Sequence, residues 1–270
     1  MKREVPVDFE GWIEAMVHRG LEACGIRPGD VVLVHTGFRS LGIPGSRDTR
    51  EGAGQKIWRA FESYLGPSGT LLVPTLSYEY VGERNPVFDE VLTQSCVGFL
   101  SETFRADHSL GRSLCPTHSV SGWGSYLDYY LYGHILDETP LGPNSPFARL
   151  TAPAGNQRAY LLFAGCSTNA NTSMHGIEEL VQAPYLWDGR LPMVIIDRDN
   201  RVTRKSLWTH SFRGYAQRYD RLLDYLTPEK VQKVPFFGNF LVALPAGFVW
   251  QRSLEVLKKD AFAFVERVGF

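Results

Sequence analysis

The sequence lacks both a strong excess of one charge and a long apolar run, the features typical of nucleic-acid-binding and membrane proteins. Lysine and arginine number 28 against 29 aspartates and glutamates, so the formal net charge is −1. A nucleic-acid-binding domain would carry a clear basic excess. No stretch approaches the roughly 18 uncharged apolar residues of a membrane-spanning helix. We therefore expect neither a nucleic acid nor a membrane as partner.

Cysteine is also scarce, and histidine lacks the spacing of a metal site. The four cysteines are scattered, with no C-x-x-C pair, so neither a disulfide framework nor a zinc knuckle is expected. The seven histidines show no H-x-x-x-H or H-x-H spacing, so no metal is predicted. The N-terminus has no apolar region typical of a signal peptide. These features favour a cytoplasmic protein with reduced thiols.

Amphipathic helical segments instead alternate with short apolar runs typical of buried strands. Helices are predicted at 8–24, around 57–65, at 97–105, 125–136, 215–226 and 248–267; strands are predicted at 31–35, 70–75, 118–124 and 160–165, with an antiparallel hairpin at 192–197 and 201–208. This alternation predicts an α/β fold in which helices cover a mixed sheet. No linker divides the chain, so residues 1–270 are expected to form one domain.

Three of the predicted buried strands end in polar residues. These strand ends are His35-Thr36-Gly37, Thr75-Leu76-Ser77 and the segment 166–169. In open α/β sheets, ligands bind beyond the carboxyl ends of the strands, so the three ends predict a common site. Polar loops that simply begin at strand ends would give the same pattern.

The third strand leads into NTSMHGIEEL, residues 171–180. Asparagine, threonine and serine favour a helix start here, which places His175 in the first turn. Glu178 follows three residues later and shares a helix face with His175. The pair has the composition of a general base with an orienting carboxylate. A structural histidine beside a solvent-facing glutamate fits the spacing too, and Glu179 is an alternative partner.

Other catalytic patterns are weaker. The sequence has no G-x-S-x-G nucleophile elbow and no phosphate-binding P-loop, and GWGSYL at 122–127 lacks the third glycine of a dinucleotide site. Cys166 with His175 is one alternative, as the thiolate pair of an acyltransferase or hydrolase. A cysteine at the end of a buried strand more often serves packing.

Six blocks of sequence, in order, resemble the aminoglycoside 3-N-acetyltransferase family. They are VLVHTGFRSLG (32–42), LGPSGTLLVPT (65–75), FDEVLTQSCVGFLSETFR (88–105), RSLCPTHSV (112–120), GPNSPFARL (142–150) and YLLFAGCSTNANTSMHGIEEL (160–180). The resemblance implies an acetyl-CoA-dependent N-acetyltransferase with the layered α/β fold of that family and no metal. It also implies that His175 is the base, that Glu178 is its partner, and that the acceptor amine attacks the thioester directly.

The resemblance further implies which residues bind the coenzyme. Residues 36–42 would line the pantetheine arm, and the hydroxyl of Thr75 would bond the coenzyme or the developing oxyanion. Arg39 and Arg112 suit phosphates, because a guanidinium binds them through two hydrogen bonds. An exposed arginine that bonds only water fits either position too. The full implied set is His35, Thr36, Gly37, Phe38, Arg39, Ser40, Leu41, Gly42, Thr75, Arg112, Ser113, Thr117 and His118.

The acceptor site is expected to contain Tyr78, Glu79, Asn169, Glu179, Trp208 and His210. A site for a polycationic aminoglycoside should be acidic. The acidic candidates are Glu79, Glu83, Asp89, Glu178, Glu179 and Asp188, but Asn169 stands where aminoglycoside-modifying members carry an aspartate. The acceptor is therefore either an aminoglycoside, in antibiotic resistance, or a biosynthetic amino sugar. A non-catalytic protein that binds CoA or a sugar, and a homodimer, remain open.

Overall fold

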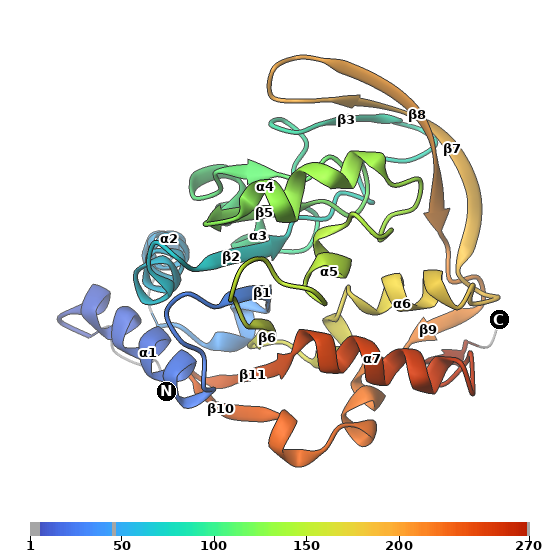
Figure 1. Cartoon of the computed structure of the whole chain (residues 1–270). Helices are drawn as coiled ribbons and strands as arrows, with labels where there is room; N and C mark the ends of the chain where they lie inside the picture. Colours follow the sequence, from blue (N-terminus) through green and yellow to red (C-terminus); the bar gives the residue numbers. More distant parts are fainter. Residues whose placement is uncertain (1–5, 45–46, 269–270) are drawn as a thin grey trace.

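The computed structural model describes residues 6–44 and 47–268, together with their side chains except at 47–51. A seven-stranded mixed sheet lies at its centre, in the order β10-β11-β6-β1-β2-β5-β4 (Figure 1). Its strands are β1 (Val31–Thr36), β2 (Thr70–Pro74), β4 (Gly111–Arg112), β5 (Val120–Gly124), β6 (Ala159–Ala164), β10 (Gln232–Phe236) and β11 (Asn239–Pro245). The layered α/β fold with a mixed sheet is confirmed.

Helices cover both faces of this sheet, because its central strands are apolar on both sides. In β1, Val32 and Val34 join the core beneath α1 (Phe9–Ala23), α2 (Arg47–Leu65) and α3 (Phe99–Asp107). Val31 and Leu33 point the other way, into the core beneath α6 (Met174–Leu180) and α7 (Ala246–Leu257). Alternation of side chains along a strand produces this three-layer arrangement.

The remaining elements extend from these layers. A three-stranded sheet, in the order β3-β7-β8, rises above the main sheet in Figure 1. Its strands are β3 (Val87–Asp89), β7 (Trp187–Ile196) and β8 (Val202–His210), and β7 and β8 form the predicted hairpin. The other elements are η1 (Phe38–Leu41), α4 (Leu127–Leu131), η2 (Tyr132–Leu136), α5 (Pro146–Arg149), η3 (Thr168–Ala170), β9 (Tyr215–Gln217), η4 (Tyr219–Tyr225), η5 (Pro228–Lys230) and β12 (Val265–Arg267).

The two C-terminal helix predictions are wrong in part. The segment predicted as a helix at 215–226 is the short strand β9 followed by the 3₁₀ helix η4. The final helix ends at Leu257, and β12 then pairs antiparallel with β9. Within the part of the chain that the structure describes, no helix is long and apolar enough to cross a membrane.

Candidate active site

The carboxyl ends of the three central strands meet at one cavity, as the strand-end pattern predicts. Strand β1 pairs parallel with both β2 and β6, so all three end at the same edge of the sheet. The cavity has a volume of about 580 Å³. Its lining is His35, Thr36, Pro74, Leu76, Tyr78, Val97, Ser101, His118, Asn169, Ala170, Asn171, Thr172, His175, His210, Ser211, Phe212, Gln217 and Tyr219.

The segment between β6 and α6 is fixed by its own polar side chains. The Asn171 side-chain oxygen accepts hydrogen bonds from the backbone N–H and the hydroxyl of Ser173, at 3.3 and 2.7 Å. Ser173 directly precedes α6, although its own side chain makes no capping hydrogen bond. The backbone N–H of Thr172 donates to His35 Nε2 over 3.2 Å. Burial lowers the pKa of His35 to about 3, which keeps it a neutral acceptor.

His175, which lines the cavity, is paired with Glu178. Its Nδ1 lies 3.1 Å from Glu178 Oε2, and the Glu178 side chain is fully buried. The Tyr219 hydroxyl donates to the same oxygen at 2.8 Å and lies 2.9 Å from His175 Nδ1. Tyr185 donates to the other carboxylate oxygen at 2.9 Å. A carboxylate can only accept in this cluster, so the proton belongs on Nδ1 and Nε2 is left as the basic nitrogen.

A second histidine–glutamate pair lies beside the first. His210 Nε2 is 2.9 Å from Glu179 Oε1, which also accepts from the backbone N–H of Leu141. Burial raises the pKa of Glu179 to about 7 and lowers that of His210 well below its ordinary value. The rings of His175 and His210 are 5.4 Å apart between centroids. Glu178 is therefore the partner of His175, and Glu179 belongs to His210.

A third imidazole completes this group. The ring centroid of His118 lies 5.6 Å from that of His175 and 5.2 Å from that of His210. Its Nδ1 pairs with the Thr117 hydroxyl at 2.9 Å. Burial and the two neighbouring histidines hold the pKa of His118 well below the usual range. Despite this clustering, the described residues contain no group of His, Cys, Asp or Glu arranged to hold a metal ion.

The coenzyme-binding residues implied by the resemblance fall into two groups. His35, Thr36 and His118 line the cavity. Residues 37–42 follow β1, contain η1 and lie outside the cavity lining; Arg39 is exposed. At Gly37 a Cβ atom would stand 2.4 Å from the Gly165 carbonyl oxygen, so the two loops touch through their backbones.

The structure does not bring the other implied coenzyme residues to the cavity. Arg112 is only 3% exposed, and its guanidinium donates to Ser119 Oγ at 2.9 Å and to the Thr75 carbonyl at 2.8 Å. Its guanidinium also lies over the Phe88 ring, and burial lowers its pKa to about 9. The Thr75 hydroxyl is fully buried against Ser121 Oγ at 3.1 Å. Arg112 and Thr75 thus stabilise the junction between β2 and β5.

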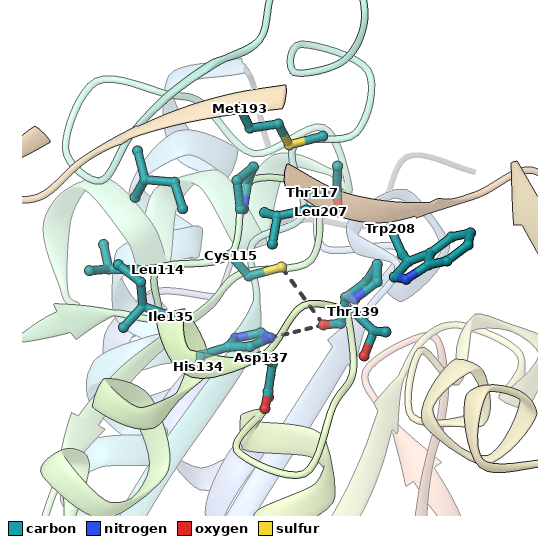
Figure 2. A pocket seen from close by; sticks show the side chains of 13 residues that line it. Leu114, Cys115, Thr117, His134, Ile135, Asp137, Thr139, Met193, Leu207 and Trp208 are labelled. Atoms are coloured by element: carbon teal, nitrogen blue, oxygen red, sulfur yellow. Dashed lines mark hydrogen bonds between the residues drawn. The ribbon is translucent and has the colours of Figure 1, made fainter. Parts of the chain in front are cut away.

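Thr117, Trp208 and His134 border a separate small cavity (Figure 2). Here the Ser113 hydroxyl lies 2.9 Å from His134 Nδ1, and His134 Nε2 lies 2.9 Å from the Pro140 carbonyl. The cavity measures about 10 Å³, which is room for about one water molecule. A sugar does not fit there, so Trp208 can meet a ligand only through its other side.

That other side faces a groove of about 800 Å³, which Trp208 lines together with Trp187, Trp250 and Glu179. Of the other predicted acceptor residues, Tyr78, Asn169 and His210 line the main cavity, whereas Glu79 is exposed outside it. The remaining acidic candidates Glu83, Asp89 and Asp188 also lie outside its lining.

Tyr219 is the main residue that the sequence did not indicate. It lies 44 positions from His175, and its place depends on Asn169, whose side-chain oxygen accepts from the Tyr219 backbone N–H at 2.7 Å. Phe212 also packs against His175, with ring centroids 5.1 Å apart. No local sequence signal marks either residue as part of the site.

The cysteine alternative gains no support from the geometry. Cys166 does not line the cavity, and burial raises the pKa of its thiol to about 12. A thiol that deprotonates so reluctantly is a poor nucleophile near neutral pH. All four cysteines are free.

Fold and site together define an α/β enzyme. Its cavity lies at the carboxyl ends of the three parallel strands β6, β1 and β2, and a histidine–glutamate pair is found there. The family model described as aminoglycoside 3-N-acetyltransferase matches residues 33–248. Aminoglycoside N(3)-acetyltransferase IV from Salmonella sp. is 31% identical over 207 residues, covering 73% of each chain. Aminoglycoside N(3)-acetyltransferase VII from Streptomyces paromomycinus is 29% identical, over 62% of this chain and 60% of that protein.

Solved structures show the same fold. AAC-IIIb with CoASH matches with a TM-score of 0.76 at 19% identity, covering 91% of this chain and 96% of the other. A mutant of the aminoglycoside acetyltransferase AAC(3)-IVa in complex with a gentamicin matches with a TM-score of 0.74 at 23% identity, covering 93% and 90%. The chain belongs to the aminoglycoside 3-N-acetyltransferase family, and it is an N-acetyltransferase.

Proposed function

We propose that this protein transfers acetyl from acetyl-CoA to an amino group of an aminoglycoside or amino sugar, with His175 as the general base. The observation that carries the proposal is the cluster of His175, Glu178 and Tyr219, in which the Nδ1 side of the imidazole is held by a buried carboxylate and a hydroxyl. The other ring nitrogen remains as the base at a cavity that His175 lines.

The reaction is a direct transfer. The acceptor amine attacks the thioester carbonyl, a C–N bond forms, and the C–S bond breaks. His175 Nε2 takes the proton that the amine nitrogen loses, and the departing thiolate is reprotonated from the imidazolium. Glu178 stabilises the imidazolium while it exists, because the two groups are then oppositely charged and 3.1 Å apart. No covalent acyl-enzyme is needed.

The residues after β1 fit the coenzyme. Thr36 lines the cavity, and the exposed Arg39 three residues further on would bind phosphate. The backbone of residues 36–42 would then follow the pantetheine arm. Arg112 and Thr75 are assigned a structural role, since both are buried and bonded within the protein. The single domain of residues 1–270 and the cytoplasmic location predicted from the sequence stay part of this proposal.

The test is free-thiol release from acetyl-CoA with kanamycin, gentamicin, apramycin and simple amino sugars as acceptors. His175→Gln should reduce kcat by roughly 10²–10⁴-fold, the usual contribution of a general base. His108→Gln is a matched control, because His108 forms a similar pair with Glu62 at 2.8 Å outside the cavity. Turnover that survives His175→Gln would overturn the mechanism. Coenzyme binding without thiol release from any acceptor would favour a non-catalytic protein.

A further inference from the structure

The cavity at His175 is neutral. Among the described residues that line it, none is an aspartate, glutamate, lysine or arginine. Three of its four histidines, His35, His118 and His210, have pKa values lowered by burial and remain uncharged at neutral pH. The other polar groups are amides and hydroxyls, including those of Asn169 and Gln217.

The two nearby glutamates do not supply negative charge to a ligand in this cavity. Glu178 is fully buried and accepts hydrogen bonds from His175, Tyr185 and Tyr219. Glu179 is paired with His210 Nε2 and lines the tryptophan groove, not the cavity. Burial raises its pKa to about 7, so it is only partly ionised at neutral pH.

The tryptophan groove offers little more charge. Trp187, Trp208 and Trp250 line it, and Glu179 is the one acid among its described lining residues. All three tryptophans are partly exposed, and the flat face of an indole ring can pack against the apolar face of a sugar ring. The groove and the cavity meet at the pair of Glu179 and His210, one residue in each lining.

These surroundings discriminate between acceptor classes. An aminoglycoside carries several ammonium groups, and each one moved from water into a cavity without a carboxylate loses hydration with no opposite charge to compensate for it. A sugar with one amino group brings no further ammonium: its single amine gives up a proton before it attacks, and the reacting amine of an aminoglycoside does the same. The hydroxyls of the monoamino sugar can bond the amides and hydroxyls of the lining.

Building on the proposed function, we infer that the preferred acceptor is a sugar whose single charged group is the reacting amine, rather than a polycationic aminoglycoside. The reacting amine lies at His175, and the sugar ring is bound by the neutral cavity and the adjoining tryptophan groove.

The first test compares kcat/KM, from thiol release, for methyl glucosaminide, 3-amino-3-deoxyglucose and 4-amino-4,6-dideoxyglucose with the values for kanamycin and gentamicin. We expect at least one monoamino sugar to exceed both aminoglycosides by about tenfold or more, with little dependence on salt. An aminoglycoside preferred by the same factor would overturn the inference and leave the transferase function intact. If no amine on the panel gives thiol release, the transferase function is overturned, and the inference with it.

The second test adds negative charge to the cavity. Asn169→Asp and Gln217→Glu are nearly isosteric, and an aspartate at 169 keeps the oxygen that accepts from the Tyr219 backbone N–H. Each variant should raise kcat/KM for kanamycin relative to the best monoamino sugar, by about tenfold. Gln232→Glu, on exposed β10, is the matched control and should leave the ratio unchanged. An unchanged ratio in both cavity variants, with melting temperatures like that of the parent, would contradict the inference.

Discussion

Glu178 and Glu179 are neighbours on α6, yet each holds a different histidine in a different way. Glu178 is paired with His175 from its own helix, and two tyrosine hydroxyls also donate to it. Glu179 is paired with His210 from β8, and it also accepts from the backbone N–H of Leu141. In the first pair, a fully buried carboxylate orients His175 and is itself held by two tyrosines. The second pair connects the β7–β8 hairpin to α6. We therefore expect the first to act in proton transfer and the second in binding.

The comparison is tested most directly at the two histidines. His175→Gln should lower kcat by roughly 10²–10⁴-fold. His210→Gln should lower kcat by less than about tenfold and act mainly on the acceptor KM, because His210 lines the cavity without holding the base. Steady-state kinetics with the best acceptor separates the two effects. Equal losses of kcat would show that the pairs act as one unit.

The glutamates should differ by a smaller factor. Glu178→Gln leaves the shape of the side chain but removes the charge that supports the imidazolium, and kcat should fall by about 10–100-fold, the usual effect of residues that orient a catalytic group. Glu179→Gln should change kcat by only a few-fold. Measured kcat values at saturating acetyl-CoA would decide. A greater loss of kcat in Glu179→Gln would reverse the assignment of the pairs.

The tyrosines refine the comparison within the first pair. The Tyr219 hydroxyl lies within hydrogen-bond distance of both His175 and Glu178, whereas the Tyr185 hydroxyl donates to Glu178 Oε1 and makes no hydrogen bond to His175. Tyr219→Phe should lower kcat about fivefold with KM unchanged, since one hydrogen bond contributes about 1 kcal/mol. Tyr185→Phe is the matched control and should lower kcat less than twofold. If the two variants lose the same amount in melting temperature but Tyr219→Phe loses more in kcat, Tyr219 is a positioning residue. If the two variants have equal kcat values, that role is refuted.

The last prediction concerns the pH dependence of folding rather than catalysis. Burial raises the pKa of Glu179 to about 7 from an ordinary 4.5, so the native state holds its proton longer than the unfolded chain. Its contribution to the free energy of unfolding should therefore decrease as the pH rises from about 4.5 to 7, by at most about 3 kcal/mol. In urea unfolding at pH 5 and pH 7.5, Glu179→Gln should gain stability relative to the parent at the higher pH. The exposed Glu14→Gln should follow the parent; parallel behaviour of Glu179→Gln would contradict the prediction.

The sequence predicted the parts of the fold that local patterns determine. Apolar runs at 31–35, 70–75 and 160–165 became three adjacent parallel strands, and their polar ends do meet at one cavity. Burial on both faces forces such runs to be apolar throughout, which makes them readable without any tertiary information.

Residues placed by distant contacts were not predictable in this way. The helix predicted at 215–226 fails at its start, where β9 pairs with β12 and the Tyr219 backbone N–H bonds Asn169. Arg112 looked like a phosphate ligand, since an arginine in a motif carries no sign of its surroundings. Its acceptors, the Ser119 hydroxyl and the Thr75 carbonyl among them, come together only when β2 and β5 pair.

The position of Tyr219 also affects how the enzyme is made in the cell. The cavity draws on residues from His35 to Tyr219, so a growing chain emerging from the ribosome cannot complete it until η4 has been synthesised. Strand β11 is made later still, although it pairs directly with β6 in the sheet. At roughly 5–20 residues per second, about 4–16 s pass between the synthesis of β6 and that of β11. During that interval the apolar edge of β6 is unpaired, which makes the nascent chain a candidate for chaperone binding.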